Sequence, residues 1–530
     1  MEKRTLLAIV LSMAILFAWG ILFDQTKNKP SPEPKQAPQA AAPNQSKPEA
    51  KTLTTAPATV AQAPAMAAST ITVDTPLYTA TFSTRGAQVI SLKLKKYLTT
   101  MDKDAKPVEI LKAPMPGLML SGGISDAGLV FESSQPSSLS ITDKPQIIEF
   151  RSQAYQGILL KKVFTIDPKT YVLGYQAIIE NHTPSAVSVS GETVFSNAYG
   201  VDEKSKGYAF EGPVLLNGKH LEEFKVDKVK TIGGYRDFTG DIKWFGFEDK
   251  YFLQTIIPKT TVSTTLIIKR PNDKSVEMHY AFAPSTLHSG GSLVKDNLIF
   301  LGPKELKPLE AVGYSLNKAL DFGFFDIIAK PLLISMNWIY KYVGSYGWTI
   351  IILTIIIKFL LYPLTLKSFT SMKELQKIQP LMKEIQQQYK DDKQKMNQEL
   401  MRLYQEHKIN PMGGCLPMLL QIPILFALYK VFYQAIELRH TPFHIFGTWL
   451  PDLSASDPYY ITPILMGASQ FVMQKMTPTT GDPMQQKVML FMPVLFTFMF
   501  LNFPSGLVIY WLISNILSIF QQAYINRKHT

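Results

Sequence analysis

Lys358 is the residue whose type and position most clearly indicate chemistry, because it stands inside an apolar run that otherwise has the composition of a membrane-spanning helix. An ammonium group near the bilayer centre costs about 2.5 to 3.5 kcal/mol on insertion scales, so a function and a partner are expected for it. Snorkelling is the alternative. Lys358 would lie roughly 13 Å along the helix from Lys367, which we take as the membrane edge, and this is further than a lysine side chain comfortably reaches.

The polar residues of the predicted spans suggest what Lys358 could do. Helical spacing places Thr354, Tyr362 and Thr365 on the same side of the helix as Lys358. The other spans offer neutral polar residues, namely Gln421, Gln434, Ser469, Gln470, Gln474, Tyr510, Trp511, Ser514, Asn515 and Ser518. Apart from Glu437 at a helix end, the five spans contain no Asp or Glu. Lys358 is therefore expected in a water-containing cavity, where it would attract a negatively charged group of a visiting molecule.

Other uses of these residues remain open. Lys358 could be satisfied by backbone carbonyls and hydroxyls for packing alone. As a desolvated base beside Ser514 or Ser518 it would make an intramembrane protease, although no nucleophile motif surrounds either serine. A transporter or channel would use Lys358 as its substrate or ion site, but such proteins normally place carboxylates at the midplane. His440 and His444 lack the supporting pattern of a metal site.

The composition predicts an integral membrane protein. The chain has 530 residues, of which 46% are hydrophobic and 18% charged, with a net charge of +12. The single cysteine, Cys415, excludes an internal disulfide framework. Residues 1–24 contain an uncharged run without a small-residue cleavage site, and we interpret them as an uncleaved transmembrane anchor. Residues 25–69 are rich in Pro, Ala, Gln and Lys and predict a disordered linker.

Residues 70–321 have the texture of a separate β-domain. Short alternating runs recur between Gly, Pro, Asn and Asp residues, which predicts a large antiparallel β-sandwich. Residues 322–343 then carry apolar side chains at helical spacing, interrupted by charges, and predict an amphipathic helix lying in the membrane interface. One further helix is expected from Pro303 to Val312, near the end of the β-domain.

Residues 344–530 predict a core of five transmembrane helices, six with the anchor. After the span with Lys358, further spans are expected at about 415–438, 459–476, 488–501 and 503–524. Between the first two, residues 368–408 predict a coiled-coil hairpin of two helices, with a kink at Pro380. Lys and Arg cluster on one side of six spans, which places both termini in the cytoplasm and the β-domain outside it. This topology explains the excess positive charge, so no direct nucleic-acid ligand is expected.

The motifs of the chain resemble those of one known family. They are Tyr362-Pro-Leu-Thr365, Asn410-Pro-Met-Gly-Gly-Cys-Leu-Pro417, Gln421-Ile-Pro423, Asp457-Pro-Tyr-Tyr-Ile461, Gln474-Lys-Met-Thr-Pro478, Asp482-Pro-Met-Gln-Gln486 and Phe503-Pro-Ser-Gly506. Together they resemble the YidC, Oxa and Alb family of membrane protein insertases. The anchor and the β-domain are similar to the Gram-negative form, which carries a periplasmic β-sandwich on the inner membrane.

This resemblance implies a non-enzymatic insertase and chaperone for nascent inner-membrane proteins, acting alone or with the Sec translocon and without a cofactor. Its hydrophilic groove, open to cytoplasm and lipid, carries a cation that attracts acidic residues of the client. Lys358 matches that position, where an arginine is expected. Groove-lining roles carry over to Thr354, Gln421, Tyr510 and Trp511. The hairpin corresponds to a cytoplasmic arm, and the short tail implies weak ribosome binding.

Overall fold

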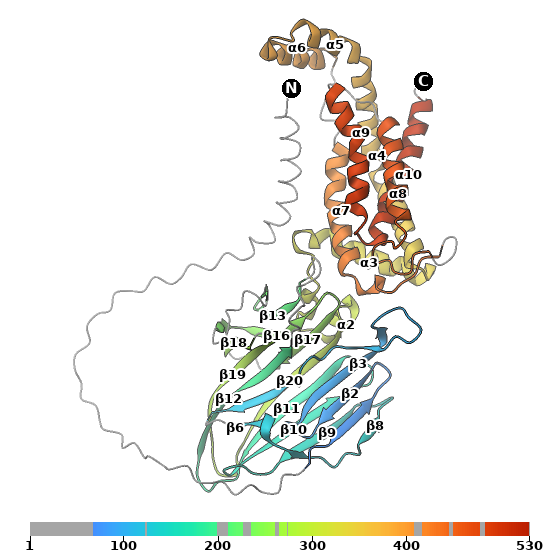
Figure 1. Ribbon diagram of the computed structural model, residues 1–530. Coiled ribbons are helices and arrows are strands. Elements are labelled where there is room, and N and C mark those ends of the chain that lie inside the picture. Colours follow the sequence, from blue (N-terminus) through green and yellow to red (C-terminus); the bar gives the residue numbers. More distant parts are fainter. Residues whose placement is uncertain are drawn as a thin grey trace, which may run out of the picture. The chain divides into compact units, whose positions relative to one another are not determined.

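The computed structural model describes residues 67–121, 124–198, 210–225, 235–259, 264–272, 274–407, 416–444, 449–476 and 483–528. The expected anchor and all but the last three residues of the expected linker lie outside the described residues, as does Cys415. The described chain contains a β-domain followed by a helical bundle with a projecting helical arm (Figure 1). The expected order of β-rich and helical regions is thus found.

Three sheets build the β-domain within the described residues. The first has the order β4 (Pro107–Glu109), β3 (Gln88–Leu98), β2 (Tyr78–Ser83), β1 (Thr70–Asp74) and β8 (Ser138–Ser140). The second, nine-stranded sheet has the order β14 (His220–Glu223), β13 (Gly212–Asn217), β16 (Ile242–Glu248), β17 (Phe252–Pro258), β20 (Ser292–Pro303), β11 (Val172–Asn181), β10 (Ile158–Ile166), β9 (Gln146–Ser152) and β7 (Phe131–Glu132). The third has the order β15 (Tyr235–Gly240), β18 (Thr264–Asn272), β19 (Ser275–Leu287), β12 (Val187–Ala198), β5 (Gly117–Leu120) and β6 (Ile124–Ser125).

Side-chain alternation explains why these segments form strands. In β11, Leu173, Tyr175, Ala177 and Ile179 are buried, and the residues between them are only partly buried. β17 is buried along its whole length, as expected for a strand covered on both faces. The strands pair antiparallel with one exception, since β1 and β8 are parallel. The described strands are therefore mainly antiparallel, as expected, with a parallel pair at this edge.

The β-domain ends in α2 (Leu306–Val312) and the short helices η3 (Leu316–Ala319) and η4 (Gly323–Phe325). α3 (Asp326–Val343) follows as a separate helix. It buries Leu333 and Met336 on one face and exposes Trp338 and Tyr342 on another. Its Asn337 side chain donates a hydrogen bond to Glu437 Oε1 at 3.0 Å, which ties α3 to the end of a bundle helix. This two-faced burial suits the interfacial position expected from the sequence.

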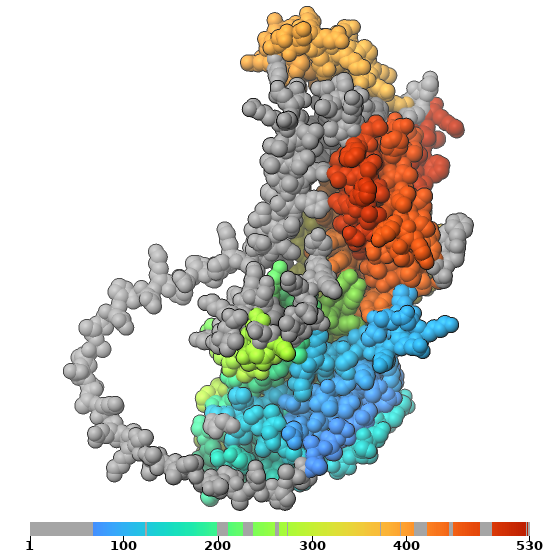
Figure 2. All heavy atoms as spheres, in the orientation of Figure 1, coloured from blue at the N-terminus to red at the C-terminus, as the bar shows by residue number. Residues whose placement is uncertain are grey.

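Five helices form the bundle: α4 (Tyr346–Lys377), α7 (Leu416–Gln434), α8 (Ile461–Met476), α9 (Pro483–Phe500) and α10 (Ser505–Lys528). α9 begins five residues before the expected Val488, and α10 extends four residues beyond the expected Tyr524. Within the described residues, Tyr346–Lys377 and Ser505–Ile525 are both long and apolar enough to cross a membrane, and Leu490–Phe500 is a shorter apolar helix. The bundle helices, coloured orange to red, form part of the surface in Figure 2. The Phe491 and Phe498 side chains of α9 are exposed.

Contacts between side chains show the direction in which each helix runs. α4 meets α10 through Lys358 with Ser518 and through Lys373 with the Ile525 carbonyl, so these two helices run parallel. α8 also runs parallel to α10, and its contacts are Gln470 with Trp511 and Met476 with Gln522. α7 and α9 run the opposite way, as the pairs Gln421–Ser514, Tyr429–Phe503, Phe496–Trp511 and Phe500–Phe503 show. Successive bundle helices therefore alternate in direction.

The arm departs from the expected hairpin at its first helix. α4 continues past the expected hairpin start at Ser368 and ends at Lys377. α5 (Gln379–Gln388) then begins with Pro380 in its first turn, so this proline starts a new helix instead of kinking a continuous one. α6 (Lys393–Glu406) packs back through a small cluster of Ile378, Met382 and Leu403. Proline lacks the N–H that a helix interior needs, which explains the break.

Candidate functional site

Lys358 lies in the middle third of α4 and faces α10. Its Nζ donates a hydrogen bond to Ser518 Oγ at 2.8 Å. Ser518 is 7% exposed, whereas Phe359 and Leu360, the next two residues of α4, are 78% and 70% exposed. The lysine thus points between helices while its neighbours point outward. Within the described part of the chain, no carboxylate forms an ion pair with Lys358.

A second polar pair lies one helical turn away on α10. Gln421 of α7 donates from Nε2 to Ser514 Oγ at 3.1 Å, and Gln421 also lies close to the Tyr510 side chain. Ser514 and Tyr510 are 1% and 2% exposed. Because Tyr510, Ser514 and Ser518 are spaced four residues apart, they share one face of α10. We call Lys358, Ser518, Ser514, Gln421 and Tyr510 the Lys358 cluster.

Thr354 and Trp511 lie differently from the cluster. The Thr354 hydroxyl is buried and donates to the carbonyl of Ile350 at 2.6 Å, four residues earlier on α4. Trp511 turns towards α8, where its Nε1 donates to Gln470 Oε1 at 3.3 Å, and its ring packs against Phe500 of α9. The structure therefore brings Lys358, Gln421 and Tyr510 onto one side of α10 and places Trp511 on another.

The α8 side of α10 forms a separate ladder. Asn515 donates to Ser469 Oγ at 3.1 Å, and Gln522 donates to the Met476 carbonyl at 2.6 Å. The Ser469 hydroxyl itself donates to the Met466 carbonyl at 2.7 Å. These bonds satisfy polar groups between packed helices, and no charged side chain takes part in them. They hold α8 against α10 on a face that adjoins the face carrying the Lys358 cluster.

The pairing of Ser514 with Gln421 was not predicted, and Lys358 beside Ser518 was considered only as part of the protease alternative. The sequence showed all four residues as polar positions in apolar helices, and the four-residue spacing of the serines signalled a shared face. Which helix would face them depended on the packing of three segments that are far apart in the chain. No local pattern reports that packing.

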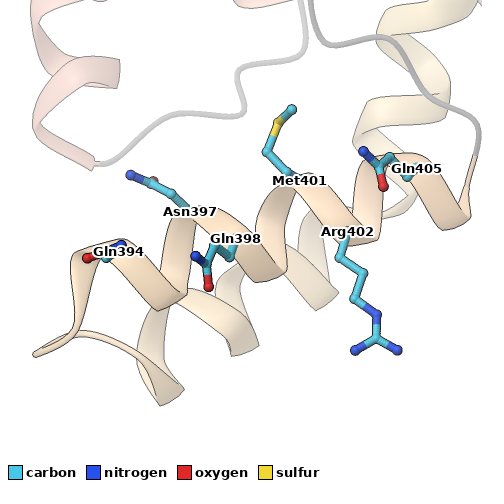
Figure 3. A pocket seen from close by; sticks show the side chains of 6 residues that line it. All are labelled: Gln394, Asn397, Gln398, Met401, Arg402 and Gln405. Atoms are coloured by element: carbon cyan, nitrogen blue, oxygen red, sulfur yellow. The ribbon is translucent and has the colours of Figure 1, made fainter.

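Two other regions offer less chemistry. His440 and His444 are not part of any group of three or more His, Cys, Asp or Glu residues suited to a metal ion, and the described residues contain no such group. A hollow of about 440 Å³ lies on α6 and is lined by Gln394, Asn397, Gln398, Met401, Arg402 and Gln405 (Figure 3). Met401 and Arg402 point to opposite sides of the helix, and Arg402 forms an ion pair with Glu406. This surface is open and amide-rich, without a paired nucleophile and base.

Comparison with known proteins gives this geometry a context. Residues 70–335 match the family model described as the YidC periplasmic domain, and residues 338–530 match the one described as 60Kd inner membrane protein. A membrane protein insertase YidC of Geotalea daltonii is 42% identical over 541 residues, covering 100% of this chain and 99% of the relative. The chain belongs to the YidC family of membrane protein insertases. A YidC insertase of Syntrophus aciditrophicus is also 42% identical, with complete coverage of both chains.

A solved structure titled as an active YidC insertase with its first transmembrane domain resolved also matches, with 19% identity and a TM-score of 0.37. It covers 85% of this chain and 91% of its own. As a YidC insertase, the chain is an inner membrane protein that acts in the insertion of membrane proteins, and its β-domain is the periplasmic domain. Membership in this family does not favour the transporter or channel alternative.

Proposed function

We propose that the Lys358 cluster is the client-binding site of this insertase. Lys358 attracts an acidic residue in the translocated tail of a client, and Thr354, Gln421, Tyr510 and Trp511 line the hydrophilic groove through which the tail passes. Apolar segments of the client leave sideways into lipid. The groove lowers the barrier to insertion by keeping the polar tail hydrated partway across the bilayer, because an unpaired polar group in hydrocarbon costs several kcal/mol.

One observation carries this proposal. Lys358 lies between helices, hydrogen-bonded by a neutral serine, with no carboxylate partner among the described residues. A structural lysine at such a depth would be expected to have a counterion, because an uncompensated charge away from water is costly. A site that receives its counterion from a client has no need of one from its own chain.

The helix directions support the topology that this mechanism requires. The five bundle helices alternate in direction, so α4 and α10 run the same way and their C-terminal ends lie on the same side. With the predicted anchor as a sixth span, both termini and the arm lie in the cytoplasm. A client segment can then enter from the cytoplasm beside Lys358 while its tail moves towards the periplasm.

The partners follow from the same topology. Nascent membrane proteins are the clients and the bilayer receives their apolar segments. We propose that the insertase also acts as a chaperone and works beside the Sec translocon. The arm, formed by α5 and α6, contacts clients or partner proteins.

The test is insertion of matched clients by the full-length protein in proteoliposomes. Two clients would differ only at one tail residue, Asp in the first and Asn in the second. A hydrogen bond to a charged group contributes about 1.5 to 3 kcal/mol, so Lys358→Gln should slow insertion of the Asp client at least tenfold and Lys358→Glu still more. Lys367→Gln is the control, because Lys367 is an exposed lysine of the same helix. Equal insertion of the Asp client by Lys358→Glu at matched expression would overturn the proposal.

A further inference from the structure

The hydroxyl of Ser518 differs from the threonine hydroxyls of α4. It shares its arrangement with Ser514, which accepts from Gln421 and also has no acceptor for its own O–H among the described residues. Thr354, Thr365 and Thr370 of α4 each donate to the carbonyl four residues earlier, at 2.6 to 3.0 Å. The Ser469 hydroxyl donates to the Met466 carbonyl. Ser518 accepts a hydrogen bond from Lys358, but its own O–H has no acceptor among the described residues, although the side chain is 7% exposed. A serine hydroxyl offers one donor as well as its acceptor lone pairs, so one donor here is unused.

Lys358 has unused donors in the same place. An ammonium group carries three N–H donors, and Ser518 takes one of them. The neighbouring hydroxyls do not compete for the other two, since Thr354 is bonded to its own helix and Ser514 accepts from Gln421. The cluster therefore holds a cation and a hydroxyl, 2.8 Å apart, each with a donor to spare.

We propose that Lys358 and Ser518 together form a two-donor carboxylate site. One N–H of Lys358 binds one oxygen of a client carboxylate, and the O–H of Ser518 binds the other oxygen of the same group. A guanidinium supplies two parallel donors from one side chain, whereas an ammonium is a point charge. Here the second donor comes from α10, and the Lys358–Ser518 hydrogen bond holds the two donors in register. This site rests on the client-binding function proposed above and names the chemical group that it recognises.

The arrangement also explains why the lysine stays between the helices. A free lysine side chain has several rotatable bonds and would reach for water, which lowers the population of any single geometry. The hydrogen bond to Ser518 selects the lysine conformer that points at α10. This conformer points away from the exposed surface on which Phe359 and Leu360 lie. Ser518 thus acts both as a positioning residue for Lys358 and as a ligand of the client carboxylate.

The experiment uses the full-length protein in proteoliposomes with the matched Asp-tail and Asn-tail clients. Ser518→Ala should reduce insertion of the Asp client three- to tenfold and leave the Asn client unchanged. Ser518→Thr keeps a hydroxyl and should stay within twofold of the parent. Ser469→Ala is the matched control, because that serine lies on α8 and its donor is already occupied, so it should not distinguish the two clients.

A second background makes the test specific. In Lys358→Arg the guanidinium supplies both donors, so adding Ser518→Ala should change insertion of the Asp client less than twofold. Two results would overturn the two-donor site. In the first, Ser518→Ala reduces insertion of the Asp client and the Asn client equally. In the second, Ser518→Ala reduces insertion of the Asp client as much in the Lys358→Arg protein as in the parent. If Lys358→Gln already leaves the Asp client unaffected, the client-binding function itself fails. If Lys358→Gln impairs that client and Ser518→Ala does not, only the two-donor site fails.

Discussion

Removing the buried cation of the β-domain should destabilise the protein strongly, and the contacts of Lys162 define how strongly. This β10 side chain is fully buried and its Nζ donates to the Gly86 carbonyl at 2.7 Å and to the Pro116 carbonyl at 2.9 Å. It also forms an ion pair with Asp126, whose carboxylate accepts from the Leu118 N–H at 2.7 Å. All three ammonium donors of Lys162 are used. Lys162 lies in the second sheet, Gly86 lies in the turn between β2 and β3 of the first sheet, and Pro116 directly precedes β5 of the third sheet.

The magnitude follows from what Lys162→Met would leave behind. Asp126 would keep backbone hydrogen bonds but lose its counterion, and burial already raises the pKa of this carboxyl and lowers the pKa of Lys162. Breaking one half of a buried ion pair costs about 3 to 5 kcal/mol. At about 2 to 4 °C per kcal/mol for a domain of this size, the melting temperature should fall by about 6 to 20 °C.

The assay is thermal unfolding of the full-length protein in detergent, followed by the circular dichroism of the strands. The neighbouring residue provides the control, since Lys161 forms an ion pair with Glu149 at 2.7 Å in which both side chains are partly exposed. Lys161→Met should cost less than about 1 kcal/mol. The double variant Lys162→Met/Asp126→Asn should be more stable than Lys162→Met alone, because it removes the stranded charge. A shift below 2 °C for Lys162→Met, or a double variant less stable than that single one, would refute the reasoning.

Three further predictions concern the bundle and the β-domain. Lys358→Arg should insert an acidic-tail client at least as well as the parent in proteoliposomes, because a guanidinium binds a carboxylate through two donors; a loss would contradict this. Gly347→Ala should lower the free energy of unfolding by about 1 to 3 kcal/mol, since a Cβ there would overlap the Phe443 ring; an unchanged melting temperature would show that the ring moves freely. Burial raises the pKa of Glu248 to about 7 from its usual 4.5, against the opposing effect of the ion pair with Lys304, so the folded state binds the proton more tightly. The contribution of protonated Glu248 to stability should therefore be greatest below pH 4.5 and be lost as the pH rises to 7. Glu248→Gln should flatten the plot of melting temperature against pH in this range. If the plots for the parent and for Glu248→Gln run parallel, Glu248 does not cause this pH dependence.

The strands and helices were largely predictable because their patterns are local. Alternation located the β-domain, and apolar length located the spans of α4 and α10, although α4 continues past the expected hairpin start at Ser368 to Lys377. The start of α9 at Pro483 was missed, because its first turn is polar and only the apolar part, Leu490–Phe500, stands out. The break at Pro380 was misjudged as a kink, since a proline suits the first turn of a new helix as well as it disrupts an old one.

The pairings inside the domains were not predictable, because each depends on segments distant in the chain. Lys161 and Lys162 look alike in sequence, and alternation says only that they face opposite sides of β10. The partners of Lys162 lie 76 and 46 residues away, at Gly86 and Pro116. Only the meeting of three sheets distinguishes a structural lysine from a surface one.

The sequence by itself determined that a cation would lie in an apolar helix without an acid near it, because the charge of each residue and the length of an apolar run are local properties of the sequence. It also determined the family, since the motifs are contiguous. Only the tertiary structure decided what the cation meets: 160 residues separate Lys358 from Ser518, and the parallel packing of α4 on α10 brings Nζ to 2.8 Å from a hydroxyl with an unused donor. Hydrogen bonds act over about 3 Å, so the packing of helices determines which side chains can form one.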